Sequence, residues 1–111
     1  MASAPEPMLD MSEIVGLYKE DARRMVGEMR SALGRWDEVK SGGAARHDLR
    51  RLSHQLRGSG RTYGFGNVTR VSKALERVMQ KLERKSILPD ERAKLSLTKK
   101  VERLAAIFAA A

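Results

Sequence analysis

His54 combines a reactive side-chain type with a position on a predicted helix that exposes it to solvent. Around it, apolar residues recur at steps of three and four, which defines the buried stripe of a helix: Leu49, Leu52, Leu56 and Tyr63. His54 lies two residues from both Leu52 and Leu56, so it points about 200° away from that stripe. Histidine is the side chain that changes protonation nearest neutral pH. An exposed imidazole can therefore act as a nucleophile and accept a phosphoryl group.

Basic residues and two glycines surround His54. Arg57 lies one turn further along the same face and can reach a phosphoryl group on His54 with charge-assisted hydrogen bonds. The same outer stripe contains His47, Arg50, Arg51 and Arg61. A glycine inside a helix costs roughly 1 kcal/mol relative to alanine, which suggests that Gly58 and Gly60 serve another purpose. We expect Gly58 to let a partner approach the imidazole and Gly60 to allow tight packing against a neighbouring helix.

Composition limits what this site can belong to. With 111 residues the chain is long enough for one domain but too short for an additional nucleotide-binding catalytic domain, so any phosphoryl group must come from another protein. The chain has no cysteine, which excludes disulfides and thiolate metal sites. His47 and His54 lie two helical turns apart, roughly 10 Å, so they cannot share one metal ion, and we expect no bound metal.

The net charge and the apolar runs bear on partners and location. Lys and Arg number 22 against 14 Asp and Glu, and the formal charge of +8 favours acidic partners. Few aromatic side chains are present for base stacking, and we expect neither a nucleic-acid nor a membrane partner. Because no apolar run approaches the length of a membrane span and the first residues lack a signal-peptide core, we expect a cytoplasmic protein.

Two long amphipathic helices are predicted in the first half of the chain. Residues 1–8 are small, rich in proline and aperiodic, which indicates a flexible tail before a domain over residues 9–111. The first helix is expected to carry these apolar positions, at alternating steps of four and three: Met11, Val15, Tyr18, Ala22, Met25, Met29, Ala32, Trp36 and Val39. Ser12 or Asp10 can cap it, and the glycines of residues 41–43 can end it. The second helix, over residues 44–63, carries His54.

Two further helices follow. The third is predicted over residues 67–85, with Asn67 as a plausible cap and five inward residues: Val68, Val71, Leu75, Val78 and Leu82. After a short connection, Pro89 suits the start of a fourth helix, which turns four residues inward: Leu97, Val101, Leu104 and Phe108. Four amphipathic helices with short loops can bury their stripes only against each other. The predicted fold is therefore an all-α antiparallel four-helix bundle with a long N-terminal helix.

The residues around His54 also resemble a known family signature. The run from His54 to Gly60, with Gly64 downstream, is similar to the pattern of histidine-containing phosphotransfer (HPt) domains. Four positions of the next helix continue the match: Val68, Ser72, Leu75 and Glu76. The resemblance covers roughly residues 10–85. The chain departs from the family in having Arg57 for the commoner lysine and Val68 for the commoner leucine.

This resemblance implies a phosphocarrier without an ATP site of its own. In such a protein His54 takes a phosphoryl group from the aspartyl phosphate of one receiver domain and passes it to another, while the receiver supplies magnesium. The implied partners are response-regulator receiver domains and a hybrid histidine kinase, and the expected state is a monomer. The supporting residues are expected to be Gln55, Arg50, Arg51, Arg61 and Glu76, the last holding the inner nitrogen of His54. Candidates for partner docking are Leu9, Ile14 and Leu17.

Two alternatives remain at this point. The run from Ser53 to Arg57 is also similar to the phosphoacceptor box of the dimerisation helices of a sensor histidine kinase. In that box, however, the residue after the histidine is a carboxylate that serves as a base, and here it is Gln55. The second alternative is a basic helical nucleic-acid-binding protein, whose binding would weaken steeply with salt and would not depend on His54.

Overall fold

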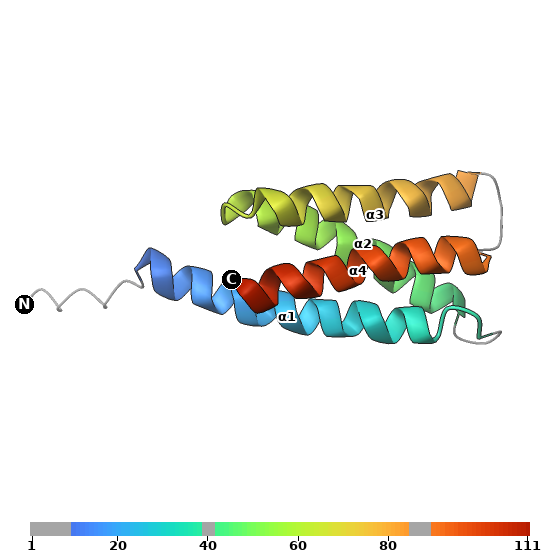
Figure 1. The fold of residues 1–111 in the computed structure, drawn as a ribbon, viewed down its shortest axis with the longest axis horizontal. Coiled ribbons are helices and arrows are strands. Elements are labelled where there is room, and N and C mark those ends of the chain that lie inside the picture. Colours follow the sequence, from blue (N-terminus) through green and yellow to red (C-terminus); the bar gives the residue numbers. More distant parts are fainter. Residues whose placement is uncertain (1–9, 39–41, 85–89) are drawn as a thin grey trace, which may run out of the picture.

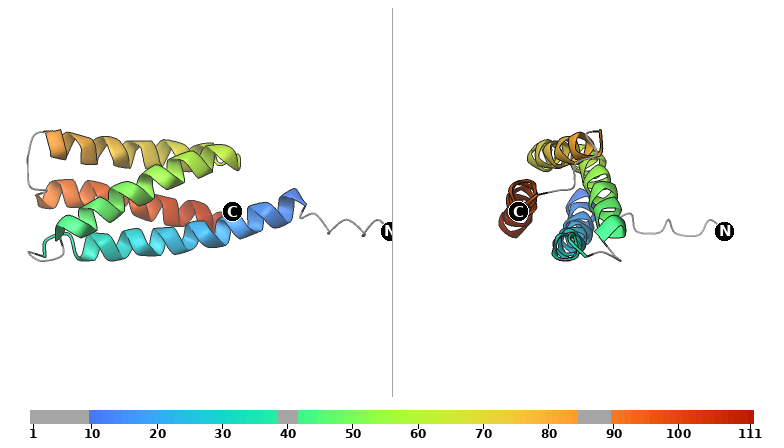
Figure 2. Two further views of the ribbon diagram at one scale, coloured as in Figure 1. Left: turned by 180° about the vertical axis from the view of Figure 1, so that it is seen from behind. Right: turned by 90° about the vertical axis from the view of Figure 1, so that its right-hand side faces the viewer.

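The described part of this computed structural model comprises residues 10–38, 42–84 and 90–111, and it is helical throughout apart from turns. It contains α1 (Met11–Gly34), α2 (Gly42–Thr62), α3 (Gly66–Arg84) and α4 (Glu91–Ala110). The helices run alternately up and down, and each packs against two others (Figure 1). Viewed end on, α1 and α3 lie diagonally opposite each other, as do α2 and α4 (Figure 2). The prediction of an antiparallel four-helix bundle is confirmed.

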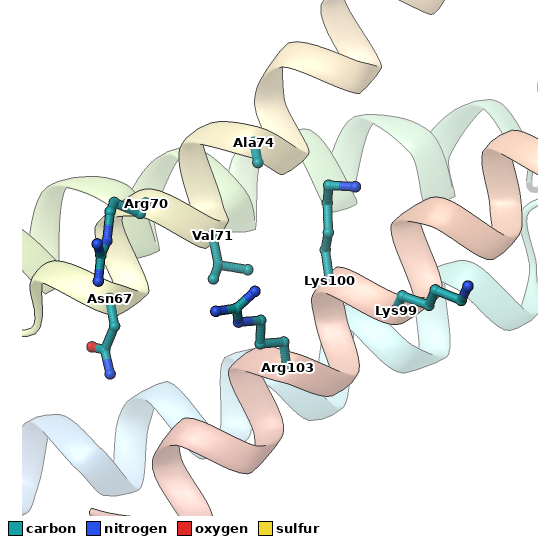
Figure 3. Close-up of a pocket in the computed structure, with 7 residues that line it drawn as sticks. All are labelled: Asn67, Arg70, Val71, Ala74, Lys99, Lys100 and Arg103. Carbon is teal, nitrogen blue, oxygen red and sulfur yellow. The ribbon is translucent and has the colours of Figure 1, made fainter.

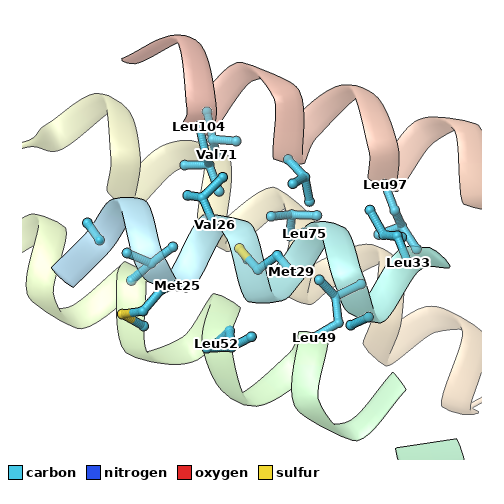
Figure 4. Close-up of a cluster of buried hydrophobic side chains, with 14 of the residues drawn as sticks. Met25, Val26, Met29, Leu33, Leu49, Leu52, Val71, Leu75, Leu97 and Leu104 are labelled. Carbon is cyan, nitrogen blue, oxygen red and sulfur yellow. The ribbon is translucent and has the colours of Figure 1, made fainter. Parts of the chain in front are cut away.

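Apolar stripes from all four helices meet in one core (Figure 4). The four inward residues predicted for α4, from Leu97 to Phe108, are each at most 1% exposed. Met25 and Met29 of α1 are buried as expected. On α3 the predicted Val78 and Leu82 are only half-buried, and Met79 is buried instead. Because burial of apolar surface drives folding, these shared stripes hold α2 and α3 side by side.

The expected first helix differs from α1 at both ends. Met11 was predicted to be buried but is 68% exposed, because the first turns of α1 project beyond the other three helices (Figure 1). The helix ends at Gly34 rather than near residue 39, and Trp36 is buried from the turn that follows. Gly42 lies at the start of α2 instead of ending the preceding helix. Val39 lies outside the described residues.

Side-chain caps fix two of the helix starts. The carboxylate of Asp10 accepts a hydrogen bond from the backbone N–H of Glu13 at 2.8 Å, which confirms one of the two predicted caps. Asp90 does the same for α4 through Ala93. Asn67 is not the residue before α3 but its second residue, so the prediction that it caps this helix is wrong. Pro89 and residues 1–9 lie outside the described part of the chain.

Candidate functional site

His54 lies on the outer face of α2. Its neighbours Leu52, Ser53 and Leu56 are at most 1% exposed, and the Ser53 hydroxyl donates to the carbonyl of Leu49 at 2.7 Å. The His54 side chain itself is 69% exposed. The exposed imidazole predicted from the apolar spacing is therefore confirmed.

A single carboxylate, that of Glu76 on α3, contacts both His54 and Arg57. Its Oε1 lies 3.2 Å from Nδ1 of His54, and its Oε2 accepts a hydrogen bond from Nη1 of Arg57 at 3.0 Å. The Glu76 side chain is only 6% exposed, whereas that of Arg57 is 41% exposed. A buried carboxylate needs partners to offset the loss of water. Arg57 and His54 are the partners that Glu76 has in this structure.

This contact determines which nitrogen of His54 is free. The contact favours the imidazole tautomer with its hydrogen on Nδ1, because an ionised carboxylate can only accept a hydrogen bond. The other nitrogen, Nε2, then has a lone pair, and no hydrogen bond within the described residues involves it. The imidazole is thus held through Nδ1 by a residue of α3, while the His54 side chain as a whole is largely exposed.

The other arginines of α2 differ in their ion pairs and in whether they lie near His54. Arg50 pairs with Glu83 of α3 at 2.6 Å, and Arg51 lies 3.8 Å from Asp48. A surface depression of about 450 Å³ brings these side chains together with the histidine: His47, Arg50, Arg51, His54, Arg57, Glu76 and Gln80. Gln55 and Arg61 do not line it. Of the predicted site residues besides His54, four line this depression (Arg50, Arg51, Arg57 and Glu76), whereas Gln55, Gly58 and Arg61 do not.

The sequence interpretation did not single out Gln80, and it gave His47 no role at the site. Both line the depression around His54. Gln80 lies four residues after Glu76 on α3, and that spacing places the two side chains on the same face of a helix. Once Glu76 is assigned to the site, this spacing is the signal that points to Gln80.

Gly58 and Gly60 have different surroundings. A Cβ atom at Gly58 would meet nothing within 4 Å, so the backbone beside His54 is open to a partner. A Cβ atom at Gly60 would lie 2.9 Å from Oγ1 of Thr69 and 3.1 Å from the carbonyl oxygen of Phe65. Gly60 is thus required for the close approach of α2 and the start of α3, as its position in the sequence suggested.

A second depression of about 480 Å³ lies between α1 and α2. Its lining includes the two described docking candidates, Ile14 and Leu17, together with Gln55; the remaining lining residues are Tyr18, Asp21, Met25, Ser59 and Tyr63. Leu17 is 56% exposed and Ile14 is half-buried. Leu9, the third candidate, lies outside the described residues. Gln55 directly follows His54, so this apolar depression and the basic one lie on adjacent sides of the histidine.

Aromatic stacking fixes the floor of the second depression. The rings of Tyr18 on α1 and Tyr63 after α2 are stacked with their centroids 4.5 Å apart. Phe65 and Phe108 contact the Tyr18 ring in turn, at centroid distances of 5.4 and 5.9 Å. Burial raises the pKa of the Tyr18 hydroxyl, which keeps this ring uncharged. These ring contacts hold the part of α1 around Tyr18 beside the end of the helix that carries His54.

No group of three or more potential ligand side chains in the described part of the chain could hold a metal ion. None of the described helices is both long enough and apolar enough to cross a membrane.

The chain was also compared with known proteins. The sequence model of the Hpt domain family matches residues 13–107, a range that takes in nearly all of the bundle. The chain therefore belongs to the Hpt domain family, whose members have a histidine phosphotransfer role in phosphorelays. Neither the curated proteins nor the solved structures gave a match.

Proposed function

We propose that this protein carries a phosphoryl group on His54 between the aspartates of receiver domains. The observation that carries the proposal is the position of the imidazole: Nδ1 faces the buried Glu76 carboxylate at 3.2 Å, while the side chain is 69% exposed. Membership of the Hpt domain family supports the same role.

The proposed transfer needs only the imidazole of His54 and the aspartyl phosphate of the receiver. The lone pair of Nε2 attacks the phosphorus of an aspartyl phosphate, and the bond between phosphorus and the aspartate oxygen breaks. The receiver regains its carboxylate, and the imidazole ring, still protonated at Nδ1, gains positive charge. Glu76 stabilises that charge through its contact with Nδ1. Attack by a second receiver's aspartate on the phosphohistidine reverses the step and restores the neutral ring.

Arg57 is proposed to bind the oxygens of the phosphoryl group. It lies one helical turn from His54, and its partly exposed guanidinium carries a fork of donors suited to phosphate. Arg50 and Arg51 line the same depression and add to its positive field despite their carboxylate partners. Gln55 and Arg61, which lie outside this depression, are proposed to contact the receiver around the histidine.

The docking surface is proposed to be the α1–α2 depression beside His54. Ile14 and Leu17 supply apolar area there, and the open backbone at Gly58 lets the receiver approach the ring. The receiver supplies an acidic pocket and its magnesium ion, so this chain contributes a positioned nucleophile and a cation. A hybrid histidine kinase fits as the source of the phosphoryl group, and no ATP site is proposed here.

The experiment uses the two histidines of the chain as a matched pair. A receiver domain labelled with radioactive phosphate is incubated with the protein and magnesium, and the label is followed by gel electrophoresis. We expect acid-labile, alkali-stable label on the wild type and on His47→Gln, and none on His54→Gln. Label that persists in His54→Gln, or transfer from none of a panel of receivers, contradicts the proposal.

The alternative of a kinase dimerisation module is disfavoured by the way the bundle closes. Such a module supplies two helices per chain and needs a second copy to complete four. Here α1, α2, α3 and α4 of one chain contact one another in a closed ring. We therefore expect a monomer of 12.4 kDa by light scattering. A dimer of twice that mass would favour the kinase module.

A further inference from the structure

The excess positive charge of the described residues lies on α2, α3 and α4 and not on α1. Residues 10–38 carry more acidic than basic side chains, so the region of α1 contributes nothing to the excess. On α3 the only two carboxylates, Glu76 and Glu83, both pair with arginines of α2. Neither carboxylate is therefore left to form an ion pair with the exposed Lys and Arg side chains of α3.

These cations form a continuous row along α3. Five exposed side chains recur at steps of three and four: Arg70, Lys73, Arg77, Lys81 and Arg84. That spacing places them on one face of the helix and spreads them over about 21 Å of its length. None of the five forms an ion pair within the described part of the chain.

A second row of cations lies alongside on α4. Lys99, Lys100 and Arg103 line a depression of about 490 Å³ between α3 and α4, together with Arg70 and Asn67. Figure 3 shows Lys100 and Arg103 reaching from α4 toward α3 across this depression. No carboxylate in the described ranges pairs with these three residues. We call the five residues of α3 and the three of α4 the basic face.

We propose that the basic face binds the phosphate backbone of a nucleic-acid duplex, and so revise the expectation that no nucleic acid is a partner. Two parallel rows of Lys and Arg, with an Asn between them, are the side chains that contact phosphates irrespective of sequence. A duplex carries one negative charge per roughly 1.7 Å of its axis. It therefore presents enough phosphates over the length of this row to engage every cation in it.

Three other polyanions fit these observations less well. Proteins bind single-stranded nucleic acid largely by stacking its bases on aromatic side chains. No aromatic residue lines this depression. A helix that binds a membrane surface needs exposed apolar side chains as well as basic ones. In the described parts of α3 and α4, Leu95 is the one large hydrophobic residue that is exposed. An acidic protein would need a row of unpaired carboxylates of the same length, which repel each other in its free state.

The basic face is separate from the depression around His54. Consecutive residues on a helix differ by about 100° in direction, so Arg77 points to a different side of α3 from Glu76. Lys99, Lys100 and Arg103 lie on α4, which does not pack against α2. The depression between α3 and α4 and the one around His54 share no lining residue, so binding of nucleic acid and phosphotransfer can be tested separately.

The test measures binding of a fluorescein-labelled DNA duplex of about 20 mixed base pairs by anisotropy, between about 50 and 200 mM NaCl. The face variant is Arg70→Gln, Arg77→Gln and Arg103→Gln combined. Its matched control, Lys19→Gln, Arg24→Gln and Arg35→Gln, removes the same charge from α1 and the residue after it, and α1 does not pack against α3. Circular dichroism verifies that both triple variants fold, and the single variant Arg77→Gln serves as a milder change at an exposed position.

We expect the face variant to weaken binding at least tenfold and to lower the slope of log affinity against log salt by about two to three, because three phosphate contacts are lost. Arg77→Gln alone should lower that slope by about one. The control and His54→Gln should bind within about twofold of the wild type. Equal losses in both triple variants, no duplex binding, or tighter binding to polyglutamate or to phosphatidylserine vesicles would overturn the proposal.

Discussion

The carboxylate of Glu76, which is almost fully buried, lies 3.2 Å from Nδ1 of His54. The two residues lie on different helices, 22 positions apart in sequence, and the packing of α2 against α3 brings them together. A buried acceptor fixes both the direction of the ring and the nitrogen that carries the proton. The orientation of the His54 ring is thus a property of the bundle and not of the local sequence alone.

Replacing Glu76 by glutamine tests this relationship. An amide cannot stabilise the positive ring of a phosphohistidine as a carboxylate does, and a hydrogen bond to a charged group contributes about 1.5–3 kcal/mol. We therefore expect Glu76→Gln to slow phosphotransfer by about 10- to 100-fold and to change the ¹⁵N shifts of the His54 ring, while His47 serves as an internal reference. Glu83→Gln, which changes a neighbouring carboxylate of α3, should do neither. Wild-type rate and shifts in Glu76→Gln would refute this role.

Arg57 offers a second test of the site. Arg57→Gln removes the cation that is proposed to bind the phosphoryl oxygens, and we expect about a tenfold slower transfer from a phosphorylated receiver. Arg57→Lys should retain most of the rate because it keeps the charge. Arg92→Gln is the matched control, since Arg92 is exposed on α4, which does not pack against α2. Similar rates in Arg57→Gln and Arg92→Gln would exclude a specific role for Arg57.

The two glycines after His54 should respond in opposite ways to alanine. Gly60→Ala places a methyl group against Thr69 and the backbone of Phe65, and we expect a loss of about 1–3 kcal/mol in the free energy of unfolding. Gly58→Ala meets open space on a helix and should gain about 0.5–1 kcal/mol. Urea unfolding followed by circular dichroism measures both. Destabilisation by Gly58→Ala would mean that this position is not open.

Receiver docking can be tested with two equally exposed leucines. Leu17 in the α1–α2 depression is 56% exposed, and Leu95 on α4 is 55% exposed. A charge placed in an apolar docking surface is costly, so Leu17→Asp should raise the Kd for a receiver domain about tenfold. Leu95→Asp should leave the Kd unchanged. Isothermal titration calorimetry provides the measurement, and equal effects of the two substitutions would place docking elsewhere.

Much of the fold follows from apolar spacing alone. The inward residues of α4 and the outward direction of His54 were predicted by steps of three and four, since a helix fixes the angle between residues. The end of α1 was not predicted. The spacing of apolar residues continues through Trp36, which is buried from a turn rather than from the helix. A pair of glycines, such as Gly42 and Gly43, is compatible with the end of one helix or the start of the next.

The candidate site, like the fold, could be predicted from the sequence only in part. The periodicity of α2 is sufficient to predict that His54 and Arg57 share a face, because both lie on one element. The contact of Glu76 with both side chains depends on how α2 and α3 pack, and no spacing within either helix encodes it. The family resemblance pointed to Glu76 but not to Gln80. The projection of Met11 beyond the bundle likewise depends on the lengths of the other three helices.

The ion pair between Arg57 and Glu76 has a thermodynamic consequence for the proposed carrier. Nη1 of Arg57 already donates to the Glu76 carboxylate at 3.0 Å, and the negative charge of that carboxylate offsets part of the charge of the guanidinium. Arg57 therefore attracts a bound phosphoryl group less strongly than an unpaired arginine would. Moderate binding of the phosphoryl group suits a phosphocarrier, because tighter binding would slow its transfer to the next protein.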